Sequence, residues 1–191
     1  MDAIQWLTSA MSAARTRLDI ATDNLANASS DGFRKHEARA RISRNGVTTL
    51  AVPNEREGAL RHTGRPLDLV IVGPGAFRMQ NADGSIISSR AGAFTRDASG
   101  HLSDDAGRVL LGTRGAIHVS ASDAFDVQRL HLGLPPGGSV RSGFLETSNV
   151  NPISEMIDVL EAQRSFESIQ KTLVAIDETR SKASNELARL K

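Results

Sequence analysis

The chain has 191 residues, which is enough for one sizeable core or two small ones. Its 23 basic and 22 acidic residues nearly cancel, so the sequence carries no basic surface of the kind that binds nucleic acid. The absence of cysteine excludes disulfides and thiolate metal sites, and the absence of a long unbroken apolar run excludes a membrane-spanning helix.

An amphipathic helix is predicted over residues 3–28. Its apolar or small residues recur at alternating spacings of three and four, which is a narrow heptad stripe. They are Ile4, Leu7, Met11, Ala14, Leu18, Ala21, Leu25 and Ala28. Charged residues interrupt this region, so we expect no cleavable signal peptide. The helix should end at the turn 27–32, because Asn, Ser, Asp and Gly all favour turns.

The middle of the chain is predicted to be an extended linker followed by a β-domain. Residues 34–58 are polar and form the linker, and residues 59–144 form a compact antiparallel β-domain. Strand-like segments alternate there with turn signals at short intervals, which argues against a doubly wound sheet. These segments are 67–72, 76–80, 86–89, 94–96, 101–103, 109–111, 116–119 and 125–132, and a Gly/Pro cluster at 133–138 ends the series.

Residues 145–191 contain a second predicted helix. It begins at Asn151-Pro152, because Asn is a favoured N-cap and Pro a favoured first helical residue. Its heptad stripe, broken at Arg180, consists of Val159, Ala162, Phe166, Ile169, Leu173, Ile176, Ala183, Leu187 and Leu190. Stripes this narrow need partners. An isolated helical hairpin packed on the β-domain is one solution, and self-assembly is the solution that we favour.

The predicted fold is therefore α+β. Long N- and C-terminal helices (1–33 with 145–191) form a coiled-coil-like domain, and the compact antiparallel β-domain is inserted between them. We expect the apolar surface that remains on the helices to be buried against neighbouring copies. The candidate subunit-interface residues are Leu7, Met11, Leu18, Leu25, Phe166, Ile169, Leu173 and Ile176.

No constellation of residues predicts catalysis. The five histidines are scattered without metal-ligand spacing, and no nucleophile elbow or phosphate-binding loop is present. The pair Asp104-Asp105 lies in a hairpin loop, where acidic residues are common turn formers. We therefore predict no enzyme activity, no cofactor, no metal, no nucleic-acid partner and no membrane insertion.

Three blocks of sequence resemble the signatures of the bacterial flagellar rod and hook axial proteins, in the order of that family. The first is Asn24-Leu25-Ala26-Asn27 with the turn that ends in Gly32-Phe33-Arg34. The second is 64–71, followed by 75–77, the Asp83-Gly84 turn and 94–97. The third is 143–151, with 163–167 in the helix beyond it.

The resemblance implies a structural subunit of the flagellar basal-body rod, the torque-transmitting drive shaft below the hook. Such a subunit would polymerise helically with itself and with other rod and hook subunits. It would pass through the flagellar type III export apparatus without a cleavable signal and lie in the rod that crosses the periplasm. The junction residues implied to fix helix exit and entry are Asn24, Asn27, Gly32, Phe33, Asn149 and Asn151.

The position within the flagellum has alternatives. Arg65-Pro66-Leu67-Asp68 most resembles the proximal rod subunit, whereas the run 146–151 fits the distal rod subunit equally well. The region 112–143 is shorter than in most members of the family. A distal rod or hook-type subunit is one alternative function, and a secreted coiled-coil binding or translocator module is another.

Overall fold

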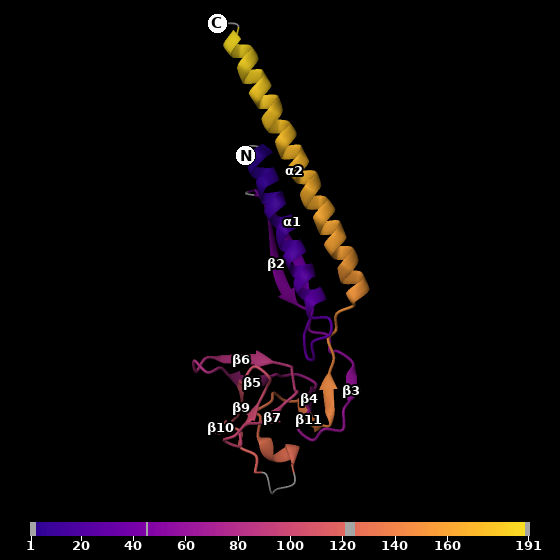
Figure 1. Cartoon of the computed structure of the whole chain (residues 1–191), viewed down its shortest axis with the longest axis vertical. Coiled ribbons are helices and arrows are strands. Elements are labelled where there is room, and N and C mark those ends of the chain that lie inside the picture. Colours follow the sequence, from indigo (N-terminus) through magenta and orange to yellow (C-terminus); the bar gives the residue numbers. More distant parts are fainter. Residues whose placement is uncertain (1–2, 45, 121–124, 190–191) are drawn as a thin grey trace. The chain divides into compact units, whose positions relative to one another are not determined.

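A computed structural model describes residues 3–44, 46–120 and 125–189 of the chain (Figure 1). The chain divides into two compact units. The helical unit contains Met1–Ala26, Lys35–Asn54 and Val150–Lys191, and the β unit contains Asn27–Arg34 and Glu55–Asn149. These boundaries differ from the predicted domains, because the signature turn belongs to the β unit and most of the predicted linker belongs to the helical unit.

Two antiparallel helices, α1 (Ala3–Ala26) and α2 (Pro152–Arg189), lie side by side in the helical unit (Figure 1). The helical side chains that are almost completely buried are mostly small, and the apolar ones among them are Ala13, Ala14, Ala21 and Ala162. Small residues let two helix backbones approach closely, so the two helices pack without large interlocking side chains. None of the described helices is both long and apolar enough to cross a bilayer.

A β-hairpin of β1 (His36–Ser43) and β2 (Gly46–Pro53) completes the helical unit and contacts α1. Its antiparallel register runs from His36 opposite Pro53 to Ser43 opposite Gly46. The Ser9 hydroxyl of α1 accepts a hydrogen bond from the Val47 amide at 3.1 Å. The predicted extended linker is therefore largely a hairpin, and it stays extended because each strand pairs with the other and packs on a helix.

The predicted coiled-coil-like domain is wrong. The helices have 24 and 38 residues and do not form a long two-helix seam, and α1 packs on the hairpin as well as on α2. Large stripe residues such as Leu18 and Phe166 stay half-buried, while the alanines between them are buried. A heptad spacing indicates that one face of a helix is apolar, but it does not indicate which part of the structure covers that face.

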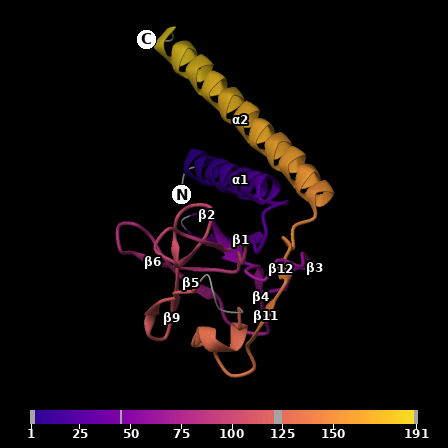
Figure 2. The same ribbon diagram turned by 60° about the horizontal axis from the view of Figure 1, so that its bottom comes forward.

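The β unit is antiparallel throughout its named strand pairs, so the chain is α+β as predicted. Its largest sheet has the order β6–β5–β9–β8–β7 with β10 beside β9, and two further pairs are β11–β4 and β12–β3. Figure 2 shows β5, β6 and β9 in a second view. The strands are β3 (Leu60–His62), β4 (Leu69–Val72), β5 (Phe77–Gln80), β6 (Ile86–Ser89), β7 (Thr95–Arg96), β8 (Leu102–Ser103), β9 (Val109–Gly112), β10 (Gly115–Ala116), β11 (Ser139–Ser142) and β12 (Phe144–Glu146).

An apolar core fills the β unit. Alternate residues of the strands point inward, and the rings of Phe77 and Phe94 meet edge to face at 5.2 Å between centroids. The buried cluster consists of Leu69, Ile71, Phe77, Met79, Phe94, Leu102, Leu110, Ile117 and Leu130. Leu130 comes from a 3-10 helix, η1 (Val127–Leu130), which lies where a strand was predicted over 125–132. Residues 121–124 lie outside the described ranges.

A buried ion pair ties β12 to the rest of the β unit. Arg90 donates to the Glu146 carboxylate at 3.1 Å and to the carbonyls of Ile71 at 2.8 Å and Gly73 at 2.6 Å. The other carboxylate oxygen of Glu146 accepts from the Gly58 amide at 3.1 Å. Both charged side chains are almost completely buried, and each is the nearest counter-ion of the other. Glu57 lies 3.9 Å from Arg90, and Arg34 lies 3.9 Å from Glu146.

The Glu146→Gln substitution should lower the free energy of unfolding of the β unit by about 3 to 5 kcal/mol, because it removes the nearest and only buried counter-ion of Arg90 among the described residues. Urea unfolding followed by circular dichroism would measure the loss. The matched control is Glu55→Gln, which removes an exposed partner of Arg34 and should cost less than about 1 kcal/mol. Equal losses for the two variants would contradict the role given to the buried pair.

Candidate subunit-assembly surface

The eight predicted interface residues lie on α1 and α2 of the helical unit. All eight side chains are half-buried: Leu7, Met11, Leu18, Leu25, Phe166, Ile169, Leu173 and Ile176. Each therefore packs partly within its own chain and keeps part of its apolar surface exposed. Their role between subunits stays a proposal.

The most exposed apolar surface of α2 is on a different side of the helix. Its members are spaced three or four residues apart and so share one side, whereas the buried Glu155 and Ala162 face the opposite way. We call this surface the outer face: Ile153 (70 % exposed), Met156 (53 %), Ile157 (53 %) and Leu160 (54 %). Val174, 51 % exposed, continues it further along the helix. This second stripe was not predicted, because it is shorter than the heptad stripe on the same helix.

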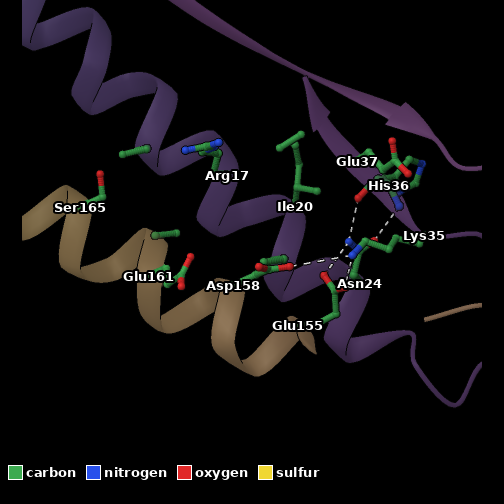
Figure 3. Close-up of a pocket in the computed structure, with 14 residues that line it drawn as sticks. Arg17, Ile20, Asn24, Lys35, His36, Glu37, Glu155, Asp158, Glu161 and Ser165 are labelled. Carbon is green, nitrogen blue, oxygen red and sulfur yellow. Dashed lines mark hydrogen bonds and ion pairs between the residues drawn. The ribbon is translucent and has the colours of Figure 1, made fainter. Parts of the chain in front are cut away.

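A buried polar cluster fixes α2 against α1 and the hairpin (Figure 3). The Asn24 amide group donates to the Glu155 carboxylate at 3.0 Å and to the His36 carbonyl at 2.8 Å, and its oxygen accepts from the His36 amide at 2.8 Å. The Lys35 ammonium group donates to the other Glu155 oxygen. Asn24 and Glu155 are each 1 % exposed. We call Asn24, Lys35 and Glu155 the anchor cluster.

The residues of the anchor cluster are stable in the interior because they supply one another's hydrogen-bond partners and counter-charges. Glu155 lies in the first turn of α2, where the helix dipole stabilises a negative charge. Lys35 neutralises that charge, and Asn24 uses both ends of its amide to hold the first residue of β1. Asn24, one of the predicted junction residues, lies near the end of α1 and within the helix that was predicted over 3–28. Lys35 and Glu155 were not predicted, because nothing local in the sequence marks a pair that is 120 residues apart.

The remaining junction residues lie in two places. In the β unit, the Gly32 amide donates to the Glu146 carbonyl at 2.6 Å, and the Asn149 amide donates to the Phe33 carbonyl at 3.4 Å. Asn27 accepts from the Ser30 amide at 3.1 Å within the turn. At the start of α2, the Asn151 side chain accepts from the Ile153 amide at 3.0 Å and caps the helix.

Gly32 could not be replaced by another residue without a clash. Its φ is +71°, and a Cβ atom would lie 2.3 Å from the Ala91 nitrogen. The turn at Gly32 therefore lies directly against the backbone at 90–91 of the same unit.

A cavity of about 440 Å³ opens beside the anchor cluster between α1, α2 and the start of β1 (Figure 3). Its lining includes small side chains such as Ala14, Ala21 and Ala162 and charges of both signs, such as Arg17 and Glu161. Within the described ranges, no group of three or more histidines or acidic residues is placed to hold a metal ion. The cavity is better suited to receiving a side chain than to carrying out chemistry.

A second ion pair stabilises the Arg-Pro-Leu-Asp run of the β unit. Arg65 binds the buried Asp68 carboxylate through two hydrogen bonds, at 2.9 and 2.7 Å. These bonds, together with the negative charge of Asp68, raise the pKa of the Arg65 guanidinium above its ordinary value. The pair fixes the approach to β4.

Two family models match the ends of the chain. The model described as "Flagella basal body rod protein" matches residues 4–34, which cover most of α1 and the signature turn. The model described as "Flagellar basal body rod FlgEFG protein C-terminal" matches residues 141–186, from β11 through most of α2. Both matched regions contain members of the anchor cluster, Asn24 in one and Glu155 in the other.

Similar proteins extend the match through the middle of the chain. The flagellar basal-body rod protein FlgG of Agrobacterium fabrum is 27 % identical over 262 aligned residues, covering 98 % of this chain and 100 % of that protein. The rod protein FlgF of Caulobacter vibrioides is 27 % identical over 83 % of this chain and 86 % of its own length. The hook protein FlgE of Brucella abortus is 31 % identical over 71 % of this chain but only 38 % of its own length.

The matches follow the residues that organise the fold. They include the turn that packs against the β core, the cap of α2 and both helices of the helical unit. Two rod proteins are matched over most of their length, and a hook protein over a smaller share. The chain is thus similar to flagellar basal-body rod proteins at both of its ends and along most of its length.

Proposed function

We propose that this protein is a structural subunit of the flagellar basal-body rod, polymerising helically with other axial subunits to form the drive shaft below the hook. The observation that carries this function is the match of rod-protein models to both ends of the chain, together with a rod protein matched along 98 % of it. The exposed outer face of α2 supports the proposal, since a contiguous apolar surface of this kind is typical of interaction sites.

The physical design of the subunit suits a load-bearing role. Both units are held by buried carboxylates with charged and polar partners: Glu155 with Lys35 and Asn24, and Glu146 with Arg90. Networks of this kind rigidify a fold, and close-packed interiors deform little under load. A rod subunit must pass torque to its neighbours, so rigidity within each unit is the property that it needs.

The finer assignments extend the same proposal. We place the protein in the proximal rod, on the resemblance of Arg65-Pro66-Leu67-Asp68 to proximal subunits, and the paired Arg65 and Asp68 are the groups that shape this run. We further propose export through the flagellar type III apparatus without a cleaved signal, and a location where the rod crosses the periplasm. The eight half-buried residues of α1 and α2 would gain contacts from neighbouring subunits.

A hook-type subunit is the second candidate. It is favoured by the hook protein FlgE of Brucella abortus, which has a higher identity, 31 %, than the two rod proteins. The match covers 38 % of that hook protein, whereas the rod proteins are matched over 86 % and 100 % of their length. This difference in coverage makes the rod the better proposal.

Deletion of the gene should abolish motility, and no hook should be visible outside the cell, because the hook has no completed rod to grow from. Electron microscopy of isolated basal bodies would show whether the rod itself is truncated. Complete rods that lack hooks would favour the hook-type alternative. Normal hooks and normal swimming would refute both.

The proximal assignment predicts the order of assembly. Because a rod grows outward, basal bodies from a strain without the distal rod subunit should still contain this protein. Immunoblots of basal bodies from that strain and from the wild type would test this. If the protein were missing only from basal bodies of the strain without the distal rod subunit, it would be assigned to the distal rod instead.

The anchor cluster predicts an effect on stability and on motility. Asn24→Ala removes three hydrogen bonds and leaves the His36 amide and the Glu155 carboxylate short of partners, which should cost about 1 to 3 kcal/mol. Chemical unfolding would measure this loss, and swimming in soft agar should weaken most at elevated temperature. The exposed Gln163→Ala is the control and should leave both unchanged. An unaltered unfolding midpoint for Asn24→Ala would contradict the structural role of the cluster.

A further inference from the structure

Two histidines of the β unit face each other across two neighbouring extended segments. His101 and His118 form an isolated antiparallel bridge. On one side of this pair the Val119 amide donates to the Gly100 carbonyl at 2.8 Å, and on the other side the Leu102 amide donates to a carbonyl of the opposite segment at 3.1 Å. The pair therefore occupies a non-hydrogen-bonded position, where opposite side chains are closest. The two imidazole rings lie edge to face, with 5.8 Å between their centroids.

Asp97 orients the His101 ring. One oxygen of its carboxylate accepts a hydrogen bond from the His101 backbone amide at 2.8 Å, which fixes the carboxylate in place. The other oxygen lies 3.7 Å from Nδ1 of the His101 ring. A negative charge on this side favours the proton on Nδ1, so the lone pair of Nε2 points away from Asp97. A carboxylate in this position is the usual neighbour of a histidine that binds a metal ion through its other nitrogen.

Gly100 makes room for the second ring. Its φ is +84°, and a Cβ atom at this position would lie 2.5 Å from Nε2 of His118. A larger residue would therefore displace the imidazole. His118 is exposed, and among the described residues its ring nitrogens have no hydrogen-bond or ion-pair partner. Each histidine of the pair thus keeps a nitrogen that can bind a ligand.

The spacing of the two rings suits a shared metal ion. Zn²⁺ binds imidazole nitrogen at about 2.0–2.1 Å, and with tetrahedral angles this places two ring centroids roughly 5 Å apart. The separation here is 5.8 Å, so a small rotation of the exposed His118 side chain would bring both nitrogens into range. In the described parts of the chain no group of three or more histidines or acidic residues could hold a metal ion, so water would complete the coordination.

We propose that His101 and His118 bind one divalent transition-metal ion of the zinc class, and that Asp97 is a positioning residue for His101. Imidazole nitrogen suits Zn²⁺, Cu²⁺ and Ni²⁺, whereas Mg²⁺ and Ca²⁺ prefer oxygen ligands. The ion would join the residue before β8 to the segment after β10, and its binding would stabilise the folded β unit. No metal was predicted from the sequence, because two histidines 17 residues apart have no recognisable ligand spacing.

Isothermal titration of the purified protein with Zn²⁺ tests the site. Saturable binding of one ion per chain is expected, and Mg²⁺ should not bind. His101→Gln and His118→Gln should each weaken Zn²⁺ binding by about tenfold or more, because losing a ligand costs at least as much as losing the partner that orients it. The matched control is His62→Gln, which changes another exposed histidine of the β unit and should leave the affinity unchanged.

Asp97→Asn separates the positioning role from a role in folding. The side-chain oxygen of Asn can still accept from the His101 backbone amide, so the turn is kept, while the negative charge beside Nδ1 is lost. The affinity for Zn²⁺ should fall by about tenfold, whereas the urea midpoint of unfolding measured without metal should stay the same. An unaltered affinity for Zn²⁺ would overturn the role given to Asp97.

Two further measurements locate the bound ion. In NMR spectra, the imidazole C–H signals of His101 and His118 should shift together when Zn²⁺ is added, and those of His62 should not. Zn²⁺ should also raise the urea midpoint of the wild-type protein but not that of His101→Gln. Absence of saturable binding, or binding that survives both His101→Gln and His118→Gln, would overturn the site. Neither result would affect the rod function, which the basal-body experiments test separately.

Discussion

The carboxylate of Glu155, buried in the helical unit, is the group on which the arrangement of that unit depends. A buried charge is costly unless it is paired, and here the pairing partners come from two other segments, Lys35 before β1 and Asn24 in α1. The helix pair has mostly small buried side chains, which provide little apolar burial. The position of α2 is therefore set by polar geometry more than by the volume of its core.

The β unit also contains a buried glutamate whose charge is paired. Glu146 accepts from Arg90 and from the Gly58 amide, and the carbonyl of the same residue accepts from Gly32 in the signature turn. One residue of β12 thus connects the turn, the start of the unit and the buried arginine. Each unit is held together by a glutamate from the C-terminal part of the chain, nine residues apart in the sequence.

Features that are encoded by a few neighbouring residues could be predicted from the sequence, whereas features that depend on contacts between distant residues could not. The antiparallel β region follows from alternation and turn residues such as Asp83-Gly84, which act over a few positions. The hairpin was missed because β1 alternates charged residues with alanines, as in Glu37 to Ala40, and this gives little apolar contrast. The coiled-coil-like domain was predicted from a spacing of apolar residues that does not specify which surface covers them. The anchor cluster was not predicted, because no pattern in the neighbouring sequence identifies its residues as partners.

The discontinuity of the helical unit has a consequence for how the molecule is made. The β unit draws most of its residues from one continuous stretch, Glu55–Asn149, whereas the helical unit needs segments from the beginning and the end of the chain. The bond between Asn24 and Glu155 spans 131 residues. During synthesis on the ribosome, α1 and the hairpin emerge well before α2, so the face of α1 that packs on α2 stays exposed to solvent until residues 152–189 have been translated.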